Sequence, residues 1–257
     1  RKKSSAQDSV QKKSKNKKKV VAKPLETPAI VVKDNLAQVE EQHNVIFKPN
    51  AGPQTDFLAA GEREVLYGGS AGGGKSYAML ADPLRFMGHP AFSGLLLRHT
   101  TEELRELIFK SQEMYPKIWP GIKWSERKMQ WTAPSGARLW MSYLDREDDV
   151  LRYQGLAFSW IGFDELTQWP TPFAWNYMRS RLRSTAHDLP VYMRATTNPG
   201  GRGHHWVKKM FIDPAPHNKS FDATDIETTE VLKYPAGHKK AGKALFKRKF
   251  IPARLSD

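Results

Sequence analysis

One glycine-rich stretch of the sequence combines the residue types that bind a phosphate chain. Gly69 is followed, after four residues, by Gly74, Lys75 and Ser76, which satisfies the pattern G-x-x-x-x-G-K-[ST]. Glycines let successive N–H groups point at one phosphate, the lysine reaches the terminal phosphates, and the serine hydroxyl ligates Mg²⁺. Lys75 is therefore expected to be catalytic, and Ser76 to be a metal ligand. The predicted nucleotide-binding residues of this loop are Gly69, Ser70, Ala71, Gly72, Gly73, Gly74, Lys75, Ser76 and Tyr77.

A pair of adjacent acids, Asp164 and Glu165, follows a short apolar run. Ligands of parallel α/β proteins gather at the carboxyl ends of strands, where one carboxylate can hold Mg²⁺ and another can activate water. The two acids could instead cap the next helix. Their position, well downstream of the glycine-rich loop, favours metal binding by Asp164 and general-base catalysis of hydrolysis by Glu165.

Thr196, Thr197 and Asn198 form a polar tip on a further apolar run. Side chains in such a place can sense a terminal phosphate and transmit its loss. The segment Asn-Pro-Gly-Gly, which begins at Asn198, also favours a plain turn. The residues alone leave both interpretations open.

These groups can meet only if the strands that carry them lie side by side and parallel. Apolar runs predict buried strands, and an alternating pattern around a turn predicts a hairpin over 128–144. The expected strands cover 64–69, 94–100, 158–166 and 191–201. Helical patterns separate them, so the predicted fold class is α/β, with a mainly parallel sheet flanked by helices.

The helices have start signals and apolar faces of their own. The expected helices cover 54–60, 75–87 with a break near Pro83, 101–115 and 173–184. Thr100 and Glu103 fit a capping box for the third. Its predicted apolar face consists of Leu104, Leu107, Ile108 and Phe109. The region after Lys208 shows little pattern.

Charge divides the chain into three parts. The net charge is +14, and residues 1–24 alone carry +9 while residues 233–257 carry +7. We expect 1–45 to be a basic, flexible arm that is solvated or binds an anionic partner, and 46–257 to be the folded domain. The absence of cysteine excludes disulfides and thiolate metal sites, and no apolar run is long enough to span a membrane.

Together these motifs resemble the ATPase domain of the large terminase subunit of tailed bacteriophages, the motor that packages DNA. The resemblance extends from about Phe47 to Ala253. The segments that carry it are "GPQTDFL", "VLYGGSAGGGKSYAML", "LLLRHTTEELRELI", "YQGLAFSWIGFDELTQW", "RSRLRS" and "NPGGRGHHWVKKMFID". The glycine-rich loop is widespread among ATPases, whereas the combination is specific.

The resemblance implies a P-loop NTPase of the additional-strand, catalytic-glutamate type, which hydrolyses ATP with Mg²⁺ to translocate double-stranded DNA into a procapsid. It implies that Gln54 reads adenine and that Thr197 and Asn198 form a coupling motif. The implied partners are duplex DNA, the portal protein, the small terminase subunit and further copies in a ring, in the host cytoplasm and without a membrane. It also implies that 208–257 leads toward a linker and a nuclease domain that this chain lacks.

The chain departs from some terminases at the centre of the loop, where Ser70 and Ala71 replace an arginine. Transition-state charge must then be met by an arginine from elsewhere, which can accelerate phosphoryl transfer by about 10³-fold or more. Arg152, shortly before the acid pair, is the first candidate finger. The alternatives Arg179, Arg181 and Arg183 lie on the helix expected over 173–184, with 179 and 183 on one face.

Two other functions remain compatible with these residues. A P-loop helicase or related motor shares the chemistry but separates strands. A non-hydrolysing switch would bind nucleotide to control assembly, with the basic arm docking a partner.

Overall fold

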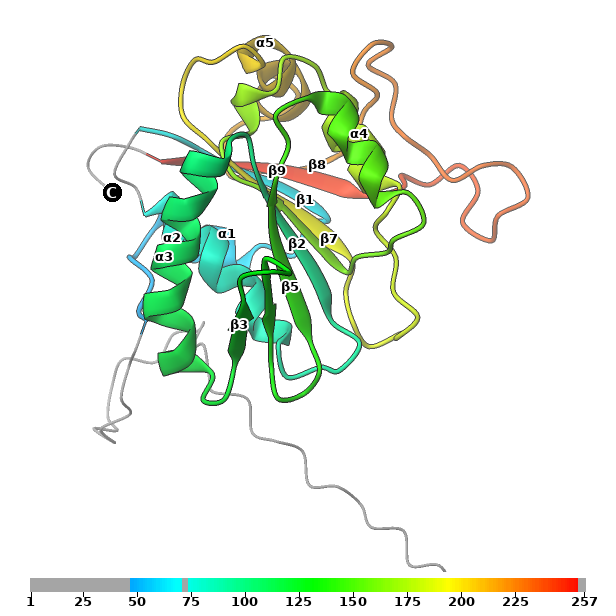
Figure 1. Cartoon of the computed structure of the whole chain (residues 1–257). Coiled ribbons are helices and arrows are strands. Elements are labelled where there is room, and N and C mark those ends of the chain that lie inside the picture. Colours follow the sequence, from blue (N-terminus) through cyan, green and yellow to red (C-terminus); the bar gives the residue numbers. More distant parts are fainter. Residues whose placement is uncertain (1–46, 71–73, 254–257) are drawn as a thin grey trace, which may run out of the picture.

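The computed structural model describes residues 47–70 and 74–253, and the described part contains one nine-stranded sheet (Figure 1). The predicted arm at 1–45 and three loop residues, Ala71, Gly72 and Gly73, lie outside this part. In spatial order the strands are β3 (Lys123–Ser125), β4 (Gln130–Thr132), β5 (Arg138–Tyr143), β2 (Ser93–Arg98), β6 (Trp160–Phe163), β7 (Tyr192–Thr197), β1 (Glu64–Gly69), β9 (Lys247–Ala253) and β8 (Ser220–Asp222).

The six neighbouring strands in the middle of this order run parallel; they are β5, β2, β6, β7, β1 and β9. Antiparallel strands flank them on both sides, β3 and β4 on one and β8 on the other. This arrangement confirms the predicted α/β class and the hairpin expected over 128–144. Strand β7 lies between β1, which leads into the glycine-rich loop, and β6, which leads into the acid pair. The expected additional strand is therefore present.

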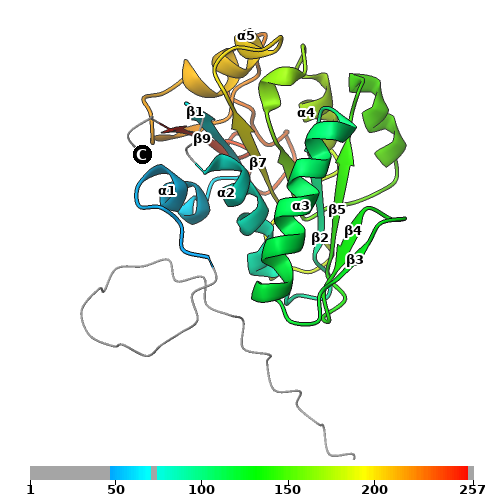
Figure 2. The same ribbon diagram turned by 60° about the vertical axis from the view of Figure 1, so that its left-hand side comes forward.

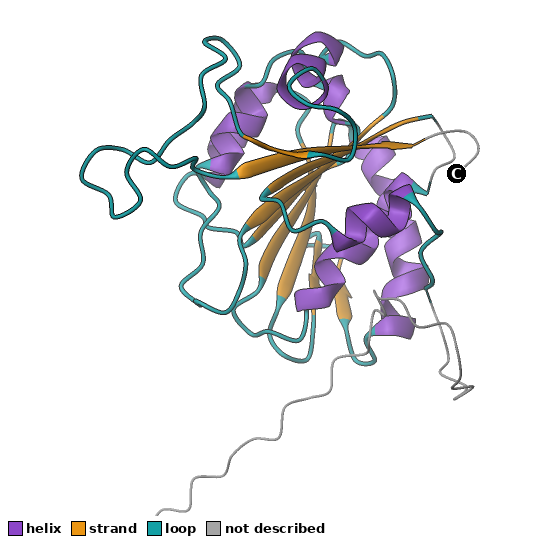
Figure 3. Cartoon of the chain, turned by 180° about the vertical axis from the view of Figure 1, so that it is seen from behind, coloured by secondary structure: helices purple, strands orange, loops and turns teal. Residues whose placement is uncertain are grey.

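Helices cover both faces of the sheet, as seen from two further directions in Figures 2 and 3. One core contains Val65 and Tyr67 of β1 together with residues of α1 (Pro53–Ala59), α2 (Lys75–Ala81) and α3 (Thr101–Ile118). The other contains Leu66 of the same strand, because successive side chains of a strand point to opposite faces. It packs against α4 (Phe173–Arg179) and α5 (His204–Val207).

Local sequence signals explain where these helices begin. The capping box of Thr100 and Glu103 is formed at the start of α3, as predicted. A short 3-10 turn, η1 (Asp82–Phe86), follows α2 at the position of Pro83, which confirms the expected break.

The buried face of α3 differs from the prediction at one residue. Phe109 was expected on this face but is 64% exposed, while Leu104, Leu107 and Ile108 are buried.

The segment after Lys208, which shows little pattern in the sequence, contributes two strands to the sheet. It contains a π-turn, η4 (Lys208–Ile212), and the strands β8 and β9. Strand β9 pairs with β1 over six residues, from Glu64 with Arg248 to Gly69 with Ala253. The strand "KRKFIPA" was missed because its charges are typical of a surface.

Helix α4 ends at Arg179, so the helix predicted over 173–184 is wrong in its second half. Arg181 and Arg183 follow in an extended segment that exchanges backbone hydrogen bonds with Phe158, ahead of β6. The prediction that Arg179 and Arg183 share a helical face therefore fails.

A buried ion cluster lies at the amino ends of β1 and β9. The Glu64 carboxylate is fully buried, accepts a hydrogen bond of 2.8 Å from Nε of Arg248, and is bonded to the guanidinium of Arg179. Burial on its own raises the pKa of Glu64, but the two arginines outweigh it and hold the pKa below its ordinary value.

Replacing Glu64 by glutamine is expected to lower the free energy of unfolding by about 3–5 kcal/mol, because the buried guanidinium of Arg248 and the partly buried one of Arg179 lose their countercharge. A carboxyl whose pKa is lowered by folding contributes stability above about pH 4.3, the ordinary glutamate value, and loses it as the pH falls through the lower folded value. Urea unfolding at neutral pH and along the acid range measures both effects. The matched control is Glu106→Gln, in an exposed i,i+4 pair with Lys110. An acid dependence that is the same in E64Q and the wild type would contradict this role.

Candidate functional site

The glycine-rich loop begins where β1 ends, and two of its glycines are required by the backbone. Gly69 has a φ of 130°, and a Cβ there would lie 2.1 Å from the carbonyl oxygen of Ala253. The next N–H, of Ser70, donates to that same carbonyl at 3.1 Å. Gly74 has a φ of 64° and directly precedes α2. Both conformations favour glycine, so the loop geometry explains these two positions of the motif.

Lys75, the first residue of α2, is buried beneath the loop. Its Nζ donates to the carbonyl oxygens of Gly69 at 3.2 Å and Ser70 at 2.5 Å. Burial lowers the pKa of Lys75, while the charges of Glu165 and Asp164 act in the opposite direction. The ammonium group is therefore aligned along the loop and within electrostatic reach of both acids.

Gln54 of α1 lies against the other end of the loop. Its Nε2 donates to the carbonyl oxygen of Gly74 at 2.9 Å, and its Oε1 accepts from the N–H of Asn50 at 2.6 Å. The side chain is 4% exposed. Both ends of the amide are thus bonded to the chain, and Gln54 joins α1 to the start of α2.

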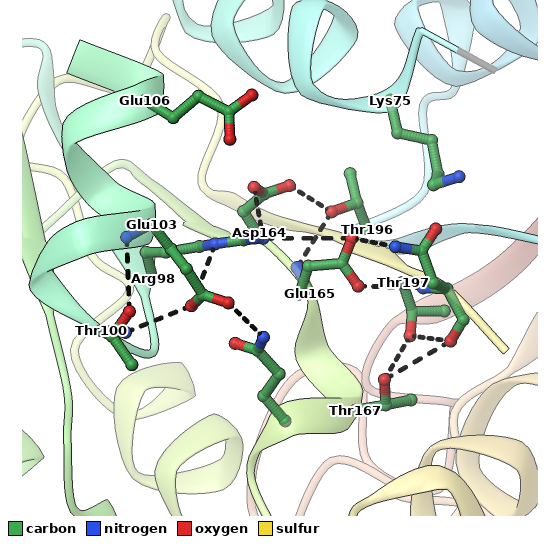
Figure 4. Close-up of polar contacts among 12 residues, drawn as sticks. Lys75, Arg98, Thr100, Glu103, Glu106, Asp164, Glu165, Thr167, Thr196 and Thr197 are labelled. Atoms are coloured by element: carbon green, nitrogen blue, oxygen red, sulfur yellow. Dashed lines mark hydrogen bonds and ion pairs between the residues drawn. The ribbon is translucent and has the colours of Figure 1, made fainter. Parts of the chain in front are cut away.

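Asp164, which follows β6, is held by two donors (Figure 4). Its Oδ2 accepts from Nη1 of Arg98 at 2.8 Å, and its Oδ1 accepts from the hydroxyl of Thr196. The side chain is almost fully buried. Burial raises the pKa of Asp164, although Arg98 and the bond from Thr196 act in the opposite direction. A fixed orientation of this carboxylate results.

Glu165 has a left-handed backbone with a φ of 61°, which costs a non-glycine residue roughly 1–2 kcal/mol. Its N–H donates to Oγ1 of Thr196 at 3.1 Å. Its carboxylate accepts from the side-chain amide of Asn198 and, at 3.1 Å, from the backbone N–H of Asn198. Burial, followed by the charge of Asp164, raises the pKa of Glu165. The strained turn aims a second carboxylate at the ends of β6 and β7.

Further polar contacts extend from the acid pair in both directions. Nε of Arg98 lies 3.4 Å from Oε2 of Glu103, whose Oε1 accepts from Gln168 at 2.7 Å. On the other side, the hydroxyls of Thr197 and Thr167 are 2.8 Å apart. A continuous network (Figure 4) therefore connects the start of α3 to the ends of β2, β6 and β7.

Arg98 is the residue of this site that the sequence reasoning missed. It ends β2, and besides Asp164 and Glu103 it lies 4.0 Å from Oε1 of Glu165. The signal was present, because a charged residue directly follows the buried run Leu95–Leu97 at the carboxyl end of a strand.

The structure divides the four candidate fingers between the two edges of the sheet. Arg152 is exposed at the carboxyl edge, where its Nη2 donates to the carbonyl oxygen of Tyr143 at 2.6 Å. Arg179 is bonded to Glu64 at the amino end of β1, about 16 Å of strand away from the loop. Arg181 and Arg183 flank Phe158 at the same amino edge. Arg179, Arg181 and Arg183 therefore lie at the edge of the sheet opposite the glycine-rich loop of the same chain.

The oxygen donors of this site suit Mg²⁺ better than a metal ion whose ligands all come from protein side chains. The described residues contain no group of three histidines, cysteines or acids that could hold an ion. They do offer the buried Asp164 carboxylate and, at the second position of α2, the half-buried Ser76 hydroxyl. One carboxylate and one hydroxyl fit an ion that keeps several water ligands and takes its remaining ligands from substrate phosphates.

Tyr77, the last residue of the predicted nucleotide-binding loop, is exposed, and Nζ of Lys110 lies 5.7 Å from its ring centroid.

The carboxyl edge of the sheet therefore gathers one lysine, one arginine and two acids from separate strands and a helix start. Such a constellation can bind a phosphate chain, hold a divalent cation and polarise a water molecule. Within the described ranges, no helix has the length and apolar character that crossing a membrane requires.

A family model described as "Terminase large subunit, T4likevirus-type, N-terminal" matches residues 66–247, more than two thirds of the chain. Comparison with curated proteins gave no match.

The fold is similar to the large terminase ATPase domain of Thermus phage P74-26, with a TM-score of 0.51 and 12% identity, over 80% of this chain and 81% of that chain. A weaker similarity is to the large terminase of bacteriophage HK97, with a TM-score of 0.44, 16% identity, and coverage of 56% of this chain and 32% of that one. Another is to the N-terminal domain of the DNA packaging ATPase of bacteriophage phi29, with a TM-score of 0.43, 17% identity, and coverage of 60% and 79%. At 12% identity the first similarity shows the fold alone, and the weaker two add nothing to it.

Proposed function

The chain belongs to the T4-like terminase large-subunit family, matching its N-terminal part, and from this we propose that it hydrolyses ATP with Mg²⁺ to drive double-stranded DNA into a procapsid. One observation carries the proposal. Lys75, at the start of the helix that follows β1, lies at the same edge of the sheet as Asp164 and Glu165, which follow β6. The negative charges of the two acids act on the lysine and partly offset the lowering of its pKa by burial.

In the proposed reaction each of these side chains has one task. Lys75 turns from the loop carbonyls to the β- and γ-phosphates, and Ser76 and Asp164 would hold Mg²⁺, which would offset phosphate charge. Glu165 accepts a proton from a water molecule as that water attacks the γ-phosphorus. The bond between the γ-phosphorus and the bridging oxygen breaks, and ADP leaves with the bond's electron pair.

We propose that the nucleotide contacts extend along the loop and that β7 carries the response to hydrolysis. Gln54 reads adenine while remaining bonded to Gly74, and Thr197 and Asn198 couple phosphate loss to movement. The direct contact of Asn198 with Glu165 supports this role. Ser70 and Tyr77 complete the described part of the binding loop, and Ala71, Gly72 and Gly73 belong to it by sequence.

An arginine finger in this proposal comes from a neighbouring subunit of a ring. Arg152 supports that arrangement, since its side chain is 43% exposed and lies at the carboxyl edge. The portal protein and the small terminase subunit are the proposed further partners, and the procapsid in the host cytoplasm is the proposed place of action. Residues 46–257 form the proposed domain, with 1–45 as a basic arm and a nuclease activity residing elsewhere in the full-length protein.

Steady-state phosphate release from ATP, with and without duplex DNA and over a wide range of protein concentration, tests the proposal. We expect turnover that depends on Mg²⁺ and rises faster than linearly with protein, because a neighbour completes each site. Constant turnover per chain would place the finger within one chain. Nucleotide-dependent oligomerisation without turnover would favour an assembly switch, and strand separation would favour a helicase.

A further inference from the structure

A long arm connects β8 to β9 and extends away from the body at the amino edge of the sheet (Figures 1 and 3). We name residues 223–246 the β8–β9 arm and residues 233–243 its tip. The N–H of Leu232 donates to Ala223 at 2.8 Å, and the N–H of Leu245 donates to Leu232 at 2.7 Å. Backbone bonds therefore hold the arm as a ladder rather than as a loose loop.

The tip is also ordered. Tyr234 and His238 stack with ring centroids 4.4 Å apart and an interplanar angle of 10°. The N–H of Tyr234 donates to the carbonyl oxygen of Lys243 at 3.0 Å, and Nδ1 of His238 accepts from the N–H of Lys240 at 3.0 Å. The folded turn therefore presents its lysines from a defined backbone.

The charge of the tip is entirely positive. It carries four exposed lysines, Lys233, Lys239, Lys240 and Lys243, and its sequence has no acid. None of the four forms an ion pair with a described residue, whereas Lys247 at the base of the arm pairs with Asp222 at 3.1 Å. Asp225, near the base, accepts from the N–H groups of Glu227 and Thr228 in its own turn. Nζ of Lys240 lies 5.7 Å from the ring centroid of Tyr234, a contact that leaves its charge uncompensated, so all four charges remain available to a partner.

The position of the arm suits a partner that must not block the nucleotide. The arm enters β9 at Lys247, at the amino edge, while the other end of β9 contacts the glycine-rich loop through Ala253. Lysine ammonium groups contact phosphate as point charges, and duplex DNA offers one phosphate charge per about 1.7 Å of helix axis. A projecting, acid-free turn can approach such a rod without burying charge.

We infer that the tip of the β8–β9 arm binds the phosphate backbone of double-stranded DNA, without reading its sequence. The inference rests on the proposed function for the identity of the nucleic acid. It assigns a DNA contact to the edge of the sheet opposite the phosphate-binding edge, so that β9 connects the two.

The test is the salt dependence of duplex binding by the whole chain in which Lys239, Lys240 and Lys243 are replaced by glutamine. Each lost phosphate contact reduces the slope of log K against log salt by about 0.9. Three lost contacts make the affinity about 40-fold less sensitive to a fourfold rise in salt. The same three positions replaced by arginine keep the charge and should keep the slope.

A matched control removes three exposed lysines of the body that form no ion pair with a described residue, Lys48, Lys117 and Lys123. An equal change of slope in both triple variants, or no change in the tip variant, would overturn the inference. ATP turnover without DNA should be the same in the tip variant and the wild type. Absence of turnover in every chain would defeat the proposed function, while the salt slopes would still decide on the DNA contact.

Discussion

Replacement of Glu165 by glutamine is expected to lower ATP turnover by about 10²–10⁴-fold, the range that a positioned general base supplies. The amide keeps the size of the side chain but cannot accept the proton of the attacking water. Nucleotide affinity should stay near that of the wild type, because Lys75 and the loop are unchanged. Phosphate release and equilibrium binding of a fluorescent ATP analogue measure the two quantities separately.

The matched control for this variant is Glu106→Gln, which alters an acid on α3 that is bonded to Lys110 and not to the acid pair. It should turn over ATP at nearly the wild-type rate. Unimpaired hydrolysis in E165Q would remove the role assigned to Glu165. Equal losses of binding and turnover would instead indicate that the contact with Asn198 holds the loop region together.

Replacement of Arg98 by glutamine is expected to reduce turnover by on the order of 10²-fold or more. The guanidinium is the charged partner of the buried Asp164 carboxylate, and removing one member of such a pair costs about 3–5 kcal/mol. Part of that cost appears as misorientation of Asp164 and part as lost stability. Initial rates over a Mg²⁺ titration, combined with thermal unfolding, separate the two.

Arg98→Lys provides the comparison for this second variant. It keeps a positive charge but cannot bridge Asp164 and Glu103 as a planar guanidinium does. Its rate should lie between those of the wild type and R98Q. Wild-type turnover in a stably folded R98Q would show that Thr196 alone orients Asp164.

The sequence was sufficient to predict the parts of the fold and site that depend on local chemistry. Gly69 and Gly74 have backbone conformations that glycine adopts freely, so the loop motif is visible in the residues themselves. The acid pair follows a fully buried strand, as its apolar neighbours indicated. The additional strand is confirmed by the order of β1, β7 and β6, while the roles of individual site residues stay predictions.

The parts that sequence reasoning missed depend on partners far away in the chain. Arg248 and the rest of β9 belong inside the sheet because Glu64, 184 residues earlier, supplies a buried countercharge. Arg98 belongs to the site because Asp164 lies beside it across neighbouring strands. In both regions the sequence shows a basic residue whose acidic partner is brought beside it only by the fold.

The close approach of Ala253 to Gly69 affects how a genetic screen of this loop should be interpreted. Any side chain at position 69 would collide with the Ala253 carbonyl, whose oxygen would lie 2.1 Å from its Cβ. Loss-of-function alleles at this codon would therefore report a broken junction between the first and last strands of the domain. Alleles of Lys75, whose Nζ lies along the loop, report nucleotide handling more directly.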